Sequence, residues 1–103
     1  ESEASIIIIG DVEHGARVTA KGNVIILGDL KGTVTAGVAG NMDAVIMASL
    51  MAPLQIRIGD MSSRFNERNK RLGRGPMIAL AEDGAIVMRS LKKSFLNNML
   101  NFA

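Results

Sequence analysis

The sequence has 103 residues and a formal net charge of +2, a length that suits one domain and a charge too small to indicate a nucleic-acid partner. Hydrophobic residues make up 48% of the chain and charged residues 21%, a balance typical of a globular protein. The absence of cysteine excludes disulfide bonds and thiolate metal sites. No run of about 18 apolar residues is present, so no membrane-spanning helix is predicted.

The first predicted elements belong to a repeat that begins at Ile6. Residues 6–23 align without a gap on residues 24–41, so that Gly10 recurs as Gly28. Within the repeat, short aliphatic segments alternate with Gly, Asp or Asn at the bends, three times in each 18 residues. This pattern is typical of a parallel β-helix in which each triangular coil covers the hydrophobic side of the next.

The repeat continues less regularly after residue 41. A slip of two residues precedes a third coil over 44–61, with Ala44 aligned on Val24. Residues 62–76 break the period and carry several arginines, which indicates a loop that is either a solvated insertion or an anion-docking patch. Residues 77–88 predict two strands joined by a turn at Glu82-Asp83-Gly84, as a last, partial coil.

The tail, residues 89–103, changes to a helical period. Leu91, Phe95, Met99 and Phe102 fall on one side, with lysines and asparagines on the other. We expect a C-terminal helix that caps the stack or packs on a partner, with membrane-surface binding as the alternative. The whole chain, 1–103, is predicted to be one all-β domain of three to four coils with this helix added.

One side of the predicted stack is apolar on both its surfaces. If the first residue of each strand faces inward, its neighbours must face outward, and on this side they are equally aliphatic. The outward residues are Ile7, Ile9, Ile25, Leu27, Val45 and Met47. A patch of this size favours a two-fold homodimer, unless the 62–76 loop or the tail covers it.

No catalytic or metal site is predicted, and neither is a cofactor. His14 is the only histidine, and the repeat places it inward as a structural residue. Asp11, Asp29 and Asp60 recur at bends, where aspartate bonds the local backbone. The glycine spacing fits neither a P-loop nor a dinucleotide fingerprint. We therefore expect a protein that is not an enzyme.

Two runs of residues in the coils resemble the C-terminal domain family of the septum-site-determining protein MinC. The first run comprises Gly10, Val12, Gly15, Ala16, Val18, Ala20 and Gly22. The second run comprises Leu30, Lys31, Gly32, Ala36, Gly37, Gly40, Ala44 and Ile46. The segments 54–58 and 82–87 are also similar to members of the family, so that the resemblance covers about residues 6–88.

The resemblance implies a right-handed parallel β-helix that dimerises through one side and binds the ATPase MinD. It implies a role in a cell-division inhibitor that blocks FtsZ ring assembly away from the division site, with FtsZ reached indirectly or through a separate N-terminal domain. The expected location is the cytoplasm, at the inner face of the membrane through the partner alone, or the plastid stroma. We expect the MinD-facing surface among Asp11, Glu13, Arg17 and Lys31.

Two other classes of β-helix protein fit parts of the pattern. A bactofilin-like scaffold polymerises end to end and needs open ends, which a helical tail would block. A hexapeptide-repeat acyltransferase uses a histidine at a subunit interface, for which His14 is the only candidate. Solution mass separates the three readings, since they predict a dimer, filaments and a trimer respectively.

Overall fold

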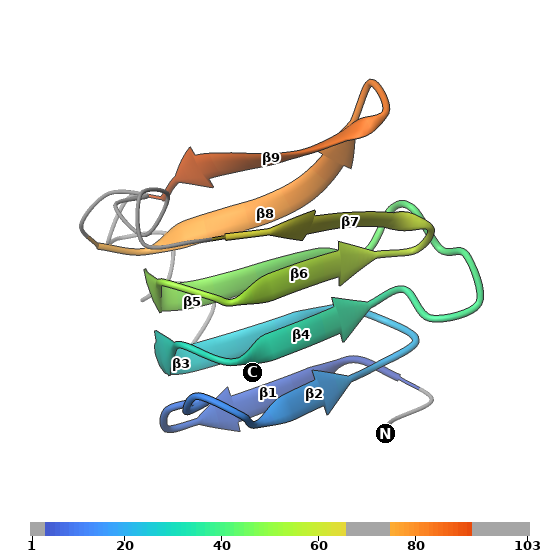
Figure 1. Ribbon diagram of the computed structural model, residues 1–103. Helices are drawn as coiled ribbons and strands as arrows, with labels where there is room; N and C mark the ends of the chain where they lie inside the picture. Colours follow the sequence, from blue (N-terminus) through green and yellow to red (C-terminus); the bar gives the residue numbers. More distant parts are fainter. Residues whose placement is uncertain (1–3, 66–74, 92–103) are drawn as a thin grey trace.

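The computed structural model describes residues 4–65 and 75–91, which fold into strands and turns without a helix (Figure 1). The strands of the first part are β1 (Ile6–Ile9), β2 (Arg17–Thr19), β3 (Val24–Leu30), β4 (Thr33–Ala36), β5 (Val45–Met51), β6 (Gln55–Ile58) and β7 (Met61–Arg64). The second part holds β8 (Met77–Glu82) and β9 (Ala85–Ser90). The all-β class predicted from the sequence is therefore correct.

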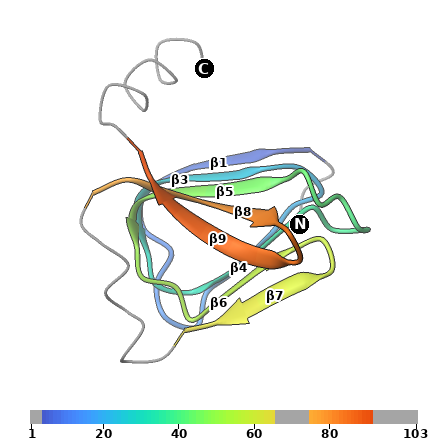
Figure 2. The same ribbon diagram turned by 90° about the horizontal axis from the view of Figure 1, so that it is seen from above.

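The strands form two facing sheets rather than the three sides of a triangular coil. One sheet has the order β1-β3-β5-β8-β9 and the other the order β2-β4-β6-β7, and viewed from above they enclose the interior between them (Figure 2). Pairing is parallel from β1 to β5 and from β2 to β6, but β7, β8 and β9 are added antiparallel. Both sheets are mixed, so the predicted right-handed parallel β-helix of triangular coils is wrong.

Among the strands that the structure describes, the 18-residue period holds only between β1 and β3. Ile6 lies beside Val24, as predicted, but Val24 lies beside Ile46 rather than beside Ala44. The extra residues are used in the turn after β4, where the amide of Asn41 donates to the carbonyl oxygen of Gly37 over 3.0 Å. The predicted alignment of the third coil is therefore wrong by two residues, which preserves the alternation of inward and outward side chains.

Two tight turns place β7 antiparallel to β6 and β9 antiparallel to β8. Ile58 lies beside Met61 across a turn in which Gly59 has a φ of 55°. Between β8 and β9, Asp83 and Gly84 have φ values of 52° and 81°, the conformation of a two-residue hairpin turn. Such turns send the chain straight back beside the strand it has just left, and a parallel coil cannot continue from there.

The predicted loop and C-terminal helix both need correction at their boundaries. Residues 62–64 belong to β7, so the predicted loop over 62–76 does not begin at residue 62. Arg89 and Ser90 are the last residues of β9, so the prediction of a helix from residue 89 is wrong. Residues 66–74 and 92–103 lie outside the described residues.

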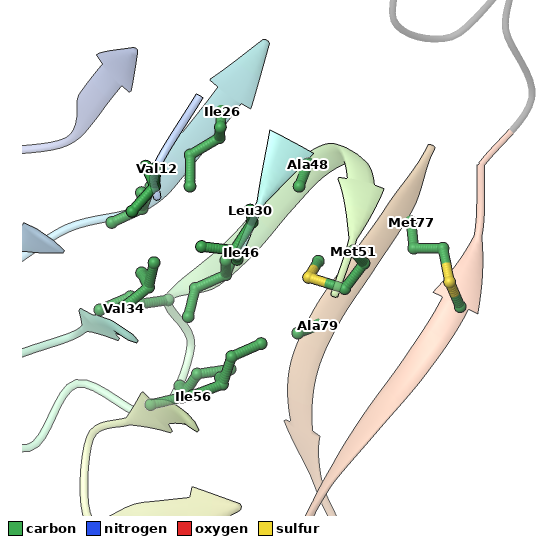
Figure 3. Packing of buried hydrophobic residues seen from close by; sticks show 14 of the residues in the cluster. Val12, Ile26, Leu30, Val34, Ile46, Ala48, Met51, Ile56, Met77 and Ala79 are labelled. Carbon is green, nitrogen blue, oxygen red and sulfur yellow. The ribbon is translucent and has the colours of Figure 1, made fainter. Parts of the chain in front are cut away.

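The core between the sheets is entirely aliphatic in the described residues, which bury no polar or charged side chain. Ile46, Leu30 and Ile56 are fully buried near its centre, and Met51 fills the space toward β8 (Figure 3). Each such side chain contributes roughly 1.5–3 kcal/mol when it is removed from water. At the β1 and β2 end of the stack, Ile6, Ile8 and Val18 pack on this core but remain only half-buried.

Candidate protein interaction surfaces

The described residues contain no group of three or more His, Asp or Glu side chains that could hold a metal ion. His14 lies in the exposed connection between β1 and β2, so the prediction that it faces inward is wrong. The repeat failed here because Ala16 donates its amide to the carbonyl oxygen of Glu13 over 3.0 Å, a turn that interrupts the alternation of a strand. The outer surfaces of the two sheets therefore provide the basis for proposing a function.

The outer surface of the first sheet is apolar across four strands. Ile7 lies beside Ile25, Ile25 beside Met47, and Met47 beside Ile78. Ile7 is 51% exposed and Ile9 is 85% exposed, while Ile25, Leu27 and Val45 are half-buried. Met47 differs from the expected row, since it is only 6% exposed in the single chain.

The apolar surface also continues further than the sequence predicted. Ile78 and Leu80 of β8 pair with Met47 and Val45, and Leu80 pairs in turn with Val87 of β9. The antiparallel position of β8 brings these residues onto the same surface, which no repeat register could indicate. Arg89, which forms an ion pair with Glu82, bounds the surface on β9.

The four residues expected to face a partner ATPase lie around one corner of the stack. Asp11 and Glu13 are exposed between β1 and β2, Arg17 is the exposed first residue of β2, and Lys31 is half-buried between β3 and β4. The backbone amide of Lys31 donates to the carbonyl oxygen of Val12 over 2.7 Å, which holds the two connections together. The corner thus presents side chains of both charges on adjacent turns.

Two glycines and one aspartate set how closely the turns approach at this corner. The amide of Asp29 donates to Oδ1 of Asp11 over 2.7 Å. A Cβ atom on Gly32 would lie 2.5 Å from the carbonyl oxygens of both Glu13 and Ala16, and one on Gly28 would meet Gly10. These glycines therefore permit a backbone contact that no other residue allows. Nζ of Lys31 lies 4.0 Å from Oδ2 of Asp29, an exposed pair that contributes little stability.

The outer surface of the second sheet is polar and carries arginine. Across the strands Arg17 lies beside Thr33, and Thr33 beside Gln55, which in turn pairs with Arg64. A depression of about 220 Å³ lies on this surface, and a second, of about 550 Å³, adjoins it at the end of β4 and β6. Thr35 and Arg57 line both depressions.

Nε of Arg57 donates to the carbonyl oxygen of Gly59 over 3.1 Å, which fixes its guanidinium between the two depressions. Among the residues that the structure describes, no ion pair joins Arg17, Arg57 or Arg64 to a carboxylate. The second sheet thus presents arginine side chains beside hydroxyl groups, whereas the first sheet presents an apolar surface. A binding role for the chain follows more readily from these two surfaces than a catalytic one.

The chain is similar to known proteins in both sequence and structure. The family described as septum formation inhibitor MinC, C-terminal domain, matches residues 1–91. A probable septum site-determining protein MinC of Agathobacter rectalis is 39% identical over 95% of this chain and 44% of its own length. A protein of the same description from Geobacillus kaustophilus is 53% identical over 60% of this chain and 27% of its own length. The chain therefore spans less than half the length of these curated relatives.

A solved structure described as the MinC:MinD cell division protein complex of Aquifex aeolicus contains a similar chain. The likeness has a TM-score of 0.81 and 32% sequence identity, and it covers 98% of this chain and 84% of that one. Across residues 4–65 and 75–91, no helix is long and apolar enough to cross a bilayer.

Proposed function

Because this chain belongs to the family of septum formation inhibitor MinC C-terminal domains, we propose that it is the dimerisation and MinD-binding domain of a cell-division inhibitor. Residues 1–103 act as a single domain in this proposal, without catalytic activity. The similar solved chain comes from a MinC:MinD complex, which supports a MinD-type ATPase as the partner. Inhibition of FtsZ ring assembly away from the division site is assigned to the larger protein, with FtsZ reached indirectly or through its N-terminal domain.

The observation that carries the dimer is the exposure of aliphatic side chains on the first sheet. Ile7 and Ile9 are 51% and 85% exposed, and Ile25, Leu27 and Val45 extend the surface. Soluble monomers commonly expose single aliphatic side chains, but an apolar surface that spans four strands is larger than is usual for a monomer. A two-fold arrangement covers it by placing the same surface of a second copy against it. Met47 contributes little to this interface, because its own chain already buries it.

The MinD-binding surface is proposed at the corner formed by Asp11, Glu13, Arg17 and Lys31. This corner lies between the two sheets, so the apolar surface remains available to the second copy while the corner is occupied. Charged residues at the edge of a protein interface chiefly set the rate of association and the specificity for the partner. The chain would work in the cytoplasm, or in a plastid stroma, and reach the inner face of the membrane only through MinD.

Sedimentation of the wild-type chain and of Ile25→Glu tests the dimer. Loss of one isoleucine from each copy, at roughly 1.5 kcal/mol or more apiece, should weaken the dimer about a hundredfold. Thr33→Glu is the matched control, since Thr33 lies on the outer surface of the second sheet. An Ile25→Glu chain that sediments like the wild type would refute the interface, and filaments would instead favour a bactofilin-like scaffold.

Binding to an ATP-loaded MinD-type ATPase tests the corner. Arg17→Glu combined with Lys31→Glu should slow association and weaken binding about tenfold, with a smaller effect at high salt. Arg64→Glu combined with Arg89→Glu makes the same change in net charge on the distant strands β7 and β9 and should leave binding unchanged. Equal losses for the two variants would show that net charge rather than the corner determines binding.

A further inference from the structure

The outer surface of the second sheet combines arginine with hydroxyl groups. In its strands β2, β4, β6 and β7, the described residues that point away from the core include three arginines and no aspartate or glutamate (Figure 1). The other outward residues are threonine, serine and glutamine. Such a surface attracts anions, and its threonine hydroxyls can donate hydrogen bonds to them.

Two of these arginines lie on opposite sides of β4. Arg17 of β2 pairs with Thr33 of β4, and Arg57 of β6 pairs with Thr35 of β4. From the spacing of strands and the rise per residue, the Cα atoms of the two arginines lie about 12 Å apart on a diagonal across β4. Two long side chains can therefore reach one anion above the threonines from opposite directions. The depression of about 220 Å³ is lined by both arginines and both threonines.

This arrangement of donors suits a phosphoryl group better than a carboxylate. A planar carboxylate is satisfied by one guanidinium in a two-fold hydrogen-bonded pair. A phosphate monoester has three acceptor oxygens that point in different directions, and it carries a charge of about −1.5 to −2 at pH 7. Because Nε of Arg57 already donates to the carbonyl oxygen of Gly59, this guanidinium is held in place with its terminal nitrogens left as donors.

The larger depression, of about 550 Å³, indicates what the phosphoryl group would be attached to. Thr35 and Arg57 line both depressions, whereas Asp60 and residues 38–40 line only the larger one. The amide of Asp60 donates to Sδ of Met42, and its exposed carboxylate remains an acceptor. Carboxylate and backbone carbonyl oxygens accept hydrogen bonds from hydroxyl or amino groups. The larger depression therefore suits a polar group that carries such donors.

We propose that the two depressions together bind a small soluble phosphate monoester. Its phosphoryl group lies between Arg17 and Arg57, and its hydroxyl- or amino-bearing remainder lies beside Asp60. A lipid headgroup is a poorer ligand, since three arginines are fewer than the roughly four to eight cations of segments that bind anionic bilayers. Arg17 also belongs to the corner proposed for MinD, so the tests use Arg57 and Thr35, which do not.

Titration of the isotope-labelled chain with glycerol 3-phosphate, followed by amide chemical shifts, tests the site. Saturable shifts are expected at residues 33–35 and 57–60, and malonate at equal ionic strength should bind more weakly. Arg57→Gln should weaken binding about tenfold or more, and Thr35→Val about threefold. Arg64→Gln is the matched control, because it removes the same charge from the same surface but lines neither depression. Its binding should stay within about twofold of the wild type.

Three results would overturn this proposal. The first is glycerol 3-phosphate binding that Arg57→Gln and Arg64→Gln weaken equally, which would show attraction to the general charge of the surface. The second is malonate binding as tight as that of glycerol 3-phosphate, which would show a site without preference for a phosphoryl group. The third is the absence of saturable shifts together with sedimentation of the chain on vesicles containing phosphatidic acid, which would make a lipid headgroup the ligand.

Discussion

Gly28→Ala should destabilise the fold by separating its first two turns. A Cβ atom at this position would lie 2.2 Å from the carbonyl oxygen of Gly10 and 2.7 Å from Oδ1 of Asp11. Real Cβ atoms essentially never approach a neighbour within 3.0 Å, and the nearest atom here is backbone that cannot rotate away. The first turn must therefore move, and the hydrogen bond from the amide of Asp29 to Asp11 is lost with it.

The expected loss of unfolding free energy is about 3 kcal/mol. Overpacking of a close contact typically costs roughly 1–3 kcal/mol, and a lost hydrogen bond adds about 1 kcal/mol. A domain of this size has a total stability of roughly 5–15 kcal/mol, so the change is large enough to measure by urea denaturation followed by circular dichroism.

Gly84→Ala is the control for the general effect of replacing a glycine with alanine in the absence of a steric clash. Gly84 has a φ of 81° and nothing within 4 Å of its Cβ position, so the substitution strains the backbone without a clash. That strain costs about 1–2 kcal/mol. A loss at Gly28 no larger than the loss at Gly84 would refute the argument that the turns are held at contact distance.

Substitutions at three further positions test separate parts of the fold, each by its urea midpoint. Ile46→Ala should cost about 2–5 kcal/mol, because Ile46 is fully buried between the sheets; a loss below 1 kcal/mol would mean that the core collapses around the gap. Asp11→Ala should cost about 1–2 kcal/mol and Asp11→Asn less, since the amide oxygen still accepts the Asp29 amide; equal losses would contradict this role. Met42→Leu should cost about 0.5–1 kcal/mol, because Sδ of Met42 accepts the amide of Asp60 over 3.3 Å; unchanged stability would show that the thioether contact contributes nothing.

In the part of the chain where the repeat holds, the sequence was sufficient to predict the strands and which of their residues face inward. Ile6 and Val24 pair as the repeat predicts, and the inward positions Ile26 and Ile46 are buried. The direction of the later strands could not be predicted in the same way. Alternation of apolar residues has a period of two in parallel and antiparallel strands alike, so Ile78 and Ala79 read equally well as part of a coil.

The same distinction applies to the interaction surfaces: features set within one strand could be predicted, and features set by contacts between distant segments could not. The exposure of Ile7 and Ile9 follows from alternation in one strand, and the outward position of Arg17 from the same rule. The burial of Met47 and the extension of the apolar surface to Ile78 depend on where β8 docks, which is a contact between segments far apart in the chain. The exposure of His14 likewise depends on a local turn that the repeat does not encode.

The reversal of direction at β7 and β8 also limits how such a chain can lengthen in evolution. A duplicated segment of one coil, inserted after β4, would continue both sheets with parallel strands and inherit the neighbours it needs on either side. The same segment inserted after β7 would meet strands that run the opposite way and would find no matching register. Gain or loss of whole turns among relatives should therefore fall before β6, while the antiparallel end keeps a fixed number of strands.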